Sequence, residues 1–240
     1  MTVLLAHALS DIGKVRETNE DSYVCQPPLF VVADGMGGHV AGEVASRMAA
    51  ETVNAIVAAA AGGEEPTSLL REAITAANEQ VYRLAQEDSE RAGMGTTLTA
   101  AFVEGAVLHW GHVGDSRLYL LRAGELSQVS EDHSLVSELV KKGSITAEEA
   151  LLHPHRNILT RAVGTGDRVK VDTGSFALAA GDKILLCTDG LTNMVTDGDI
   201  AAALSRDDDG AALLAALVAK ANGAGGLDNI TAILVCFGAV

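Results

Sequence analysis

The chain has 240 residues, a length for which we expect a single domain spanning residues 1–240. Hydrophobic residues make up 48% and charged residues 20%, which is typical of a globular protein and excludes a disordered one. The 17 basic and 32 acidic residues give a formal net charge of −15. This charge argues against a nucleic-acid backbone or an anionic membrane as the main partner.

Three cysteines, Cys25, Cys187 and Cys236, are widely spaced and odd in number. No CxxC pair or Cys/His cluster accompanies them, which disfavours a zinc site and a disulfide framework, so we expect free thiols in a reducing cytosol. The opening segment MTVLLAHALSD has no basic residue before its short apolar stretch, and no run approaches the roughly 20 apolar residues of a spanning helix. The sequence therefore predicts a cytoplasmic protein without a signal peptide or membrane anchor.

The first part of the chain combines strands with two helices. Apolar runs predict strands at 2–11, 22–25 and 27–35. One helix is expected to begin near Val40 and to end before Gly62, and a second to run from about Ser68 to Gln86 on an apolar stripe.

From Gly95 the pattern changes to strands at 96–103, 106–115, 116–124 and 125–130. The turns EG, GD and AG between them are typical of an antiparallel meander. The remaining predicted elements are helices at 134–142 and 147–152, strands at 169–178 and 182–190, helices at 197–204 and 211–221, and a strand at 229–237. Strands and helices thus alternate in blocks, which favours an α+β layered fold.

Apolar strands repeatedly end at an aspartate beside a glycine or asparagine. The pattern occurs at Asp34-Gly35, Gly114-Asp115, Asp189-Gly190 and Asp228-Asn229, and Asp21 precedes another strand. Asp and Gly are ordinary turn residues, but these strands would carry their carboxylates straight out of a core. Carboxylates gathered at one edge repel unless a cation lies between them. Because no Cys or His set has ligand spacing, we expect Mg²⁺ or Mn²⁺.

Arg16 lies five residues before Asp21 and is the candidate anion-binding residue. Its planar guanidinium can pair bidentately with a phosphate. A single arginine in a turn is also commonly a surface ion-pair residue, so both interpretations stay open at this point.

Taken together, seven short motifs resemble the metal-dependent Ser/Thr protein phosphatases, the PPM or type 2C family, and in particular its short bacterial members. In chain order they are RETNED (16–21), VVADGMGGH (31–39), GTT (95–97), HVGDSR (112–117), DHS (132–134), CTDGL (187–191) and DNIT (228–231). The resemblance implies a four-layer sandwich of two antiparallel sheets, each faced outside by a pair of helices.

The resemblance also implies a site with two Mn²⁺ or Mg²⁺ ions and a weaker third one. Asp34 resembles the ligand shared by both metals, Gly35 would offer its carbonyl, and Asp189 and Asp228 would hold the first metal. Asp115 resembles the ligand of the third metal, which it would share with Asp189.

Three further residues acquire roles from the resemblance. Arg16 corresponds to the phosphate-binding arginine, and Glu20 and Asp21 correspond to groups that hold metal-bound water. The implied activity is hydrolysis of phosphoserine and phosphothreonine by a water that bridges the two metals, without a phospho-enzyme. The implied partners are phosphoproteins, including a Ser/Thr kinase, and we expect a monomer.

One position departs from part of the family. Some members have a His directly after the Asp-Gly pair as general acid, whereas this chain has Met36. His39, three residues further on, is a candidate substitute, and metal-bound water is the other.

The segment 132–166 corresponds to the family's flap beside the active site. Its cations, among them Lys141, Lys142 and Arg156, could attract an acidic phosphopeptide or could simply form a solvated surface.

Three alternatives to an active protein phosphatase are an inactive PPM-like binding or sensor module, a small-molecule Mg/Mn phosphohydrolase, and a phosphatase of sigma-factor regulators. The first is disfavoured because Asp34, Asp189, Asp228 and Arg16 are all present. The second is disfavoured by the lack of a Walker-type loop and by an aromatic content of only 3%. The third usually carries sensor domains, which this sequence lacks.

Overall fold

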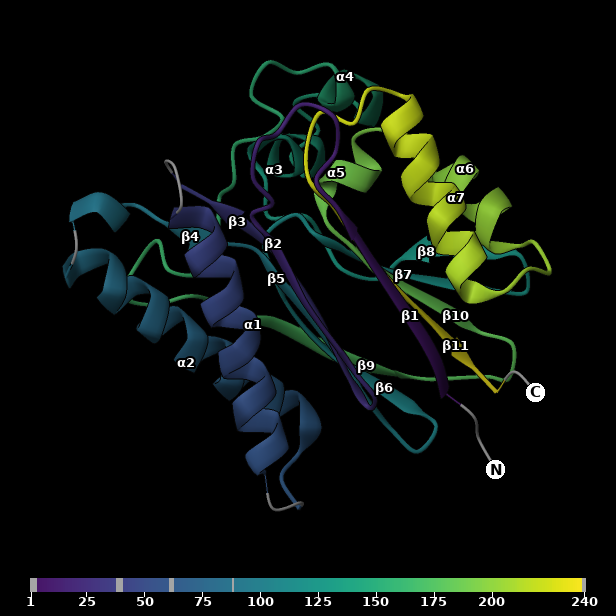
Figure 1. The fold of residues 1–240 in the computed structure, drawn as a ribbon, viewed down its shortest axis with the longest axis horizontal. Coiled ribbons are helices and arrows are strands. Elements are labelled where there is room, and N and C mark those ends of the chain that lie inside the picture. The colour runs from purple at the N-terminus through teal and green to yellow at the C-terminus, as the bar shows by residue number, and fades with distance from the viewer. Residues whose placement is uncertain (1–3, 38–40, 61–62, 88, 239–240) are drawn as a thin grey trace.

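Figure 1 shows the computed structural model, which describes residues 4–37, 41–60, 63–87 and 89–238. Its strands form two antiparallel sheets. The first has the order β2 (Asp21–Gln26), β3 (Leu29–Met36), β5 (Leu98–Glu104), β6 (Val107–Val113) and β9 (Asp172–Ala177), with β4 (Gly95–Thr96) beside β3. The second has the order β1 (Leu4–Asp11), β11 (Ile230–Phe237), β10 (Lys183–Cys187), β7 (Arg117–Arg122) and β8 (Glu125–Gln128).

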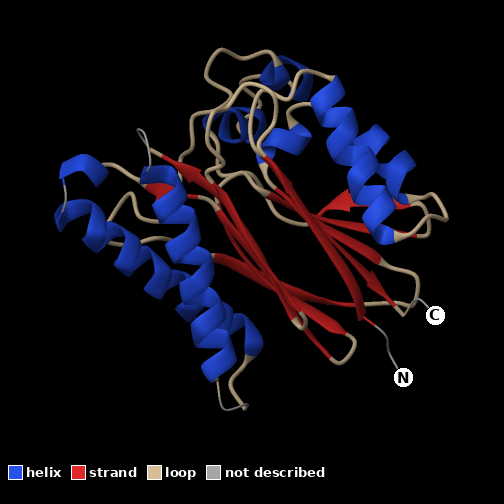
Figure 2. Cartoon of the chain, in the orientation of Figure 1, coloured by secondary structure: helices blue, strands red, loops and turns tan. Residues whose placement is uncertain are grey.

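Helices cover the outer face of each sheet, as Figure 2 shows. The first sheet is covered by α1 (Ala41–Ala59) and α2 (Pro66–Glu87), and the second by α6 (Asp197–Leu204) and α7 (Gly210–Gly223). The arrangement is the expected four-layer α+β sandwich.

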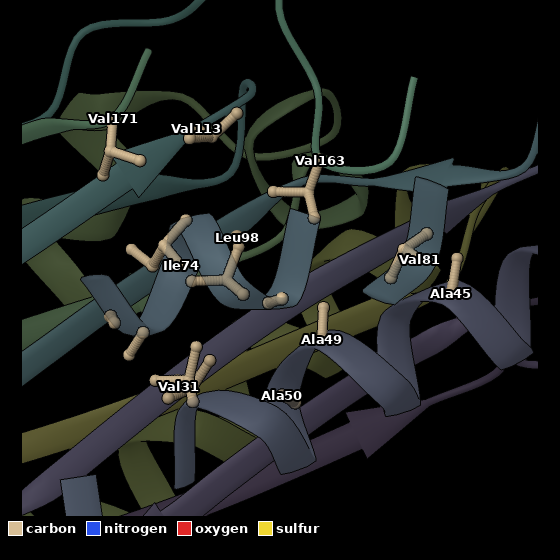
Figure 3. Close-up of a cluster of buried hydrophobic side chains, with 14 of the residues drawn as sticks. Val31, Ala45, Ala49, Ala50, Ile74, Val81, Leu98, Val113, Val163 and Val171 are labelled. Carbon is tan, nitrogen blue, oxygen red and sulfur yellow. The ribbon is translucent and has the colours of Figure 1, made fainter. Parts of the chain in front are cut away.

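Three apolar layers hold the sandwich together. In β3, Val31 packs toward α1 and α2, in the cluster drawn in Figure 3, whereas Phe30 and Val32 belong to the layer between the sheets. Because alternate residues of a strand face opposite sides, a strand buried on both faces is a continuous apolar run. This explains the sequence LFVVA that precedes Asp34.

The expected meander over 96–130 is wrong in one respect. β5 pairs with β6 and β7 pairs with β8, but the two hairpins lie in different sheets. The Gly114-Asp115 turn therefore connects the sheets instead of closing a hairpin. A Gly-Asp turn between alternating strands predicts a reversal of the chain, but the choice of neighbouring strand depends on long-range packing.

Three short helices, α3 (Leu135–Lys141), α4 (Ala147–Leu151) and α5 (Asp189–Thr192), lie near one end of the sandwich, at the top of Figure 1. The structure places α5 directly after β10, where the sequence predicted no helix, and η1 (Ser89–Arg91) after α2. Between β8 and β9 lie α3, with Ser134 as its N-cap, and α4. The two ends of this segment meet where Ser134 bridges to Leu159.

Within the ranges that the structure describes, no helix is long and apolar enough to cross a bilayer.

Candidate metal centre

The two sheets bring the predicted aspartates to one end of the sandwich. We call this set the acidic rim: it consists of Asp21, Asp34, Asp115, Asp189 and Asp228. Asp21 stands directly opposite Asp34 in the antiparallel register of β2 and β3. Asp189 begins α5 after β10, and Asp228 precedes β11, its neighbour in the second sheet. The rim therefore draws its side chains from both sheets.

The backbone of Asp34 is fixed by two consecutive threonines. The Asp34 N–H donates to Thr97 Oγ1 (2.9 Å), and the Asp34 carbonyl accepts from the Thr97 N–H (2.9 Å) and from Thr96 Oγ1 (2.8 Å). These contacts give the GTT motif a physical role that the sequence alone did not assign. They hold the end of β3 at a defined position.

Gly35 occupies a position that admits no side chain. A Cβ there would lie 2.1 Å from the Gly42 carbonyl oxygen and 2.6 Å from the Glu20 carbonyl oxygen. The Gly35 N–H donates to the same Glu20 carbonyl (3.1 Å). The close approach of three backbone segments therefore explains the glycine after Asp34.

The loop between β1 and β2, which carries Arg16 and Glu20, is anchored to the rim by Asn229. Asn229 Oδ1 accepts from the Glu20 N–H (2.8 Å), and its Nδ2 donates to the carbonyls of Ile12 and Thr18 (3.0 Å each). The motif DNIT contained this residue, but sequence reasoning gave it no role. Asn229 is buried, and its partners lie more than two hundred residues away in the chain, so no local pattern pointed to this role.

Burial and mutual repulsion raise the pKa values of the rim carboxyls. The pKa of Asp21 rises to about 7, first through burial and then through the charges of Asp189 and Asp228. The pKa of Asp34 lies well above its ordinary value for the same reasons. Burial, followed by the charge of Asp189, raises the pKa of Asp115 to about 8. The protein thus gathers carboxyls that cannot all be ionised without a positive charge among them.

Two rim oxygens are left without partners. Among the described residues, Asp21 Oδ1 and Asp189 Oδ1 are buried and accept no hydrogen bond. Asp189 Oδ2 is held by Asn193 Nδ2 (2.9 Å), and Asp21 Oδ2 by the Thr188 hydroxyl (2.8 Å). Burying a carboxylate oxygen without a hydrogen-bond donor costs folding free energy unless a cation binds it. The donor set, all oxygen, fits a hard divalent cation.

The rim is not arranged as a finished set of ligands. In the part of the chain that the structure describes, no three His, Cys, Asp or Glu side chains are already placed around one point. Asp228 Oδ2 instead accepts from Arg16 Nη2 at 2.7 Å, and the Arg16 side chain is 48% exposed. Arg16 and a cation would therefore compete for the same carboxylate.

The structure also places Glu20, Met36 and Cys187, which lie in or near the motifs that mark the site. Glu20 lies beside the rim, and burial, with a contribution from Asp228, raises its pKa despite Arg16. Met36 ends β3 and has no proton to donate, whereas His39 lies outside the described residues. Cys187 is fully buried, which raises its pKa to about 12, so it cannot serve as a thiolate nucleophile.

Two of the cations predicted for the surface of segment 132–166 are paired with nearby acids. Lys141 pairs with Glu131, and Lys142 pairs with Glu138. The tip of this segment is instead apolar, since Leu151 and Leu152 are 71% and 87% exposed. This distribution weakens the expectation that the segment attracts acidic peptides.

Comparisons with known proteins agree with this geometry. The sequence model of the protein phosphatase 2C family matches residues 16–225. The serine/threonine phosphatase stp of Listeria welshimeri is 41% identical over 234 residues, which cover 94% of this chain and 93% of that protein. The crystal structure of the Mycobacterium tuberculosis serine/threonine phosphatase PstP/Ppp superimposes with a TM-score of 0.92 at 40% identity, covering 97% of this chain and 98% of that one.

A further solved structure bears on the metal. The catalytic domain of the serine/threonine protein phosphatase PstP in complex with two manganese ions has a TM-score of 0.92 at 38% identity, with 100% of both chains covered. The present chain belongs to the protein phosphatase 2C family of metal-dependent phosphatases. Within this family it is a serine/threonine protein phosphatase, and its relatives favour neither an inactive binding module nor a small-molecule phosphohydrolase.

Proposed function

We propose that the acidic rim is the catalytic centre of this phosphatase and that its residues divide the work as follows. Asp34, the Gly35 carbonyl, Asp189 and Asp228 would hold two divalent cations, Mn²⁺ or Mg²⁺. When bound, such cations supply Lewis acidity, which lowers the pKa of water and offsets phosphate charge. The observation that carries the proposal is the unpartnered Asp189 Oδ1, buried among carboxyls with raised pKa values.

Arg16 would bind the phosphate group of the substrate. Its present partner is Asp228, and a cation on Asp228 would leave the guanidinium without that partner. Because Arg16 is nearly half exposed, it can turn toward an incoming phosphate and donate two parallel hydrogen bonds. The switch of Arg16 from Asp228 to substrate would link cation loading to phosphate binding.

Three acidic residues would support this centre. Glu20 and Asp21 would lie behind the ligands and orient water by accepting hydrogen bonds from it. Asp115, which stands where the chain crosses between the sheets, would hold a third and weaker cation together with Asp189. The raising effect of Asp189 on the pKa of Asp115 supports this pairing, because it requires the two carboxyls to be near each other.

The substrates would be phosphoserine and phosphothreonine in proteins, including a Ser/Thr kinase, and the enzyme would act as a monomer. Incubation with a phosphorylated bacterial Ser/Thr kinase domain tests the first part by the release of phosphate. Light scattering during size-exclusion chromatography tests the second.

The decisive experiment for the centre combines calorimetric Mn²⁺ titration with hydrolysis of a phosphothreonine peptide. Asp189→Asn should lose a tight Mn²⁺ site and reduce kcat by at least about 100-fold. Mutating a residue that only orients a metal ligand already lowers affinity or activity by about 10- to 100-fold, and removing the ligand itself should cost no less. The matched control is Asp208→Asn, since Asp208 pairs with Arg206 in the loop between α6 and α7. Unchanged Mn²⁺ binding in Asp189→Asn would reject the assignment.

A further inference from the structure

The residue His133, which the proposed mechanism does not use, holds the turn that carries Asp115. The Gly114 N–H donates to His133 Nδ1 (3.0 Å), and the His133 N–H donates to the Gly114 carbonyl (2.7 Å). Gly114 has φ of +113°, and a Cβ there would lie 2.6 Å from Thr97 Cβ. The turn is therefore fixed from one side by Thr97 and from the other by His133.

Asp132, the residue before His133, binds the chain on the C-terminal side of Asp115, whereas His133 binds Gly114 on its N-terminal side. Asp132 accepts from Arg117 Nε and Nη2 (2.9 Å and 2.7 Å), and Arg117 lies two residues after Asp115. Between them, Ser116 Oγ is hydrogen-bonded to Thr97 Oγ1 (2.7 Å), the hydroxyl that binds the Asp34 N–H. Two consecutive residues thus hold both flanks of Asp115.

His133 also belongs to the base of the 132–166 segment. Its carbonyl accepts from the Thr160 N–H (2.9 Å), next to the bridge between Ser134 and Leu159. Because Nδ1 accepts from the Gly114 N–H, the ring proton is assigned to Nε2, which donates to Asp172 Oδ2 (3.0 Å). Arg161 Nη1 lies 2.9 Å from the same Nε2 and donates to Asp172 Oδ1 (2.9 Å), so Asp172 and Arg161 are the charged groups that face this side of the ring. The His133 side chain is only 5% exposed, so this orientation is fixed by packing and by both ring nitrogens.

We propose that His133 is a positioning residue that couples the base of the 132–166 segment to the cation-binding carboxylate of Asp115. Docking of Thr160 and Leu159 onto residues 133 and 134 holds His133, and His133 holds Gly114, so Asp115 keeps its place only while the base is closed. The inference rests on the proposed cation role of Asp115. A purely structural role for His133 would affect the thermal midpoint without affecting the weak cation site.

Replacing His133 by asparagine or by glutamine tests its two ring contacts, Nδ1 with Gly114 and Nε2 with Asp172, separately. In His133→Asn, Oδ1 stands the same number of bonds from Cα as Nδ1 and can accept from the Gly114 N–H. In His133→Gln, the amide is one bond longer and can reach Asp172 while the Gly114 N–H loses its acceptor. Asn is therefore the conservative variant for the turn, and Gln is the disruptive one.

The measurements are calorimetric Mn²⁺ binding and the dependence of p-nitrophenyl phosphate hydrolysis on Mn²⁺, both with the full chain. We expect His133→Gln to weaken the weakest Mn²⁺ step by about 10- to 100-fold, as supporting residues of metal sites do. His133→Asn should stay within about twofold of wild type, a range too small to reflect loss of such support. His109→Asn is the matched control, because His109 is also buried on the first sheet and should lose only stability.

A second measurement needs no variant that could fail to fold. Coupling is reciprocal, so Mn²⁺ at concentrations that fill the weak site should slow amide exchange at Gly114 and also at Leu135 and Thr160 of the segment base. The Asp115→Ala protein should lack this response. Slowing at Gly114 alone would overturn the coupling.

The outcomes distinguish the inference from the proposal beneath it. If Asp115→Ala weakens the weak Mn²⁺ step and His133→Gln does not, the role of His133 is wrong and the proposed centre stands. If Asp115→Ala itself leaves Mn²⁺ binding unchanged, the third-cation assignment fails, and the coupling fails with it. Equal weakening in the Asn and Gln variants would also reject positioning through Gly114.

Discussion

Asp21 and Asp34 are directly opposite each other on neighbouring antiparallel strands. Like charges in such a pair destabilise a sheet, and here burial strengthens the effect by keeping water away. Burial raises the pKa of Asp34 most, and the charge of Asp21 is the largest of the neighbouring charges that raise it further. The fold therefore tolerates a local penalty at the rim in the absence of a cation.

The first prediction concerns this penalty. Asp34→Asn removes one member of the pair, so it should raise the thermal midpoint of the protein in EDTA by a few degrees, on the order of 1 kcal/mol. The same variant should lose at least about 100-fold in kcat with saturating Mn²⁺. Scanning fluorimetry and a phosphopeptide assay measure the two effects. A lower midpoint in EDTA would contradict the repulsion argument.

The second prediction separates phosphate binding from cation binding at Arg16. Arg16→Ala should raise KM for a phosphopeptide and weaken inhibition by free phosphate by about tenfold or more, the value of a charge-assisted hydrogen bond. Mn²⁺ binding should be unchanged or tighter, because Asp228 loses its competing partner. Arg16→Lys should restore phosphate binding only in part, since an ammonium cannot form the two-pronged contact. Weaker Mn²⁺ binding in Arg16→Ala would show that the competition does not exist.

The third prediction tests the crowding around Gly35. Gly35→Ala would force a Cβ to within 2.1 Å of a carbonyl oxygen, so backbone must move. We expect a loss of about 1–3 kcal/mol in the free energy of unfolding and loss of activity. Gly223→Ala is the control, because nothing lies within 4 Å of its Cβ position in α7. That variant should be neutral or slightly stabilising, and comparable losses in both would refute the steric argument.

The fourth prediction concerns pH and lies away from the rim. Burial alone would raise the pKa of Asp182, but the hydrogen bonds from Arg122 and the Ala179 N–H outweigh it and lower the pKa. A depressed folded-state pKa gives stability above the unfolded pKa of about 3.9, and this stability is lost as the pH falls through the folded pKa. The thermal midpoint of Asp182→Asn should therefore lie below wild type at pH 7, and the difference should shrink below about pH 4. Scans in EDTA keep cation release out of the comparison, and a difference independent of pH would contradict the assignment.

Local pattern was sufficient for most elements of the fold. The helix predicted at 197–204 coincides with α6, and the strand predicted at 2–11 matches β1 over the residues of it that the structure describes, 4–11. The pattern failed where strand pairing depends on residues far away in the chain. The alternating apolar residues on either side of Gly114 predict two strands, but they do not show that β6 and β7 belong to different sheets. The four residues of α5 were too short to give any helical period.

The site shows the same division. Aspartates after apolar strands marked Asp34, Asp115 and Asp189 in advance, because the need to carry carboxylates out of a core is visible in the sequence. The work of Asn229 was not visible, since its partners are about two hundred residues away in the chain and the 209-residue separation from Glu20 leaves no local trace. Cation occupancy of the individual ligands remains a prediction.

The position of β11 has a consequence for synthesis on the ribosome. This last strand of the sequence lies between β1, the first, and β10. Until it emerges, β1 has no neighbour in its sheet, and Asp228 is absent from the rim. Pairings of such long sequence separation form late because the chain must first close a large loop. A nascent chain that displays Asp34, Asp115 and Asp189 but not yet β11 would thus lack Asp228 at the rim, and we expect phosphatase activity to begin only after β11 has emerged and paired with β1.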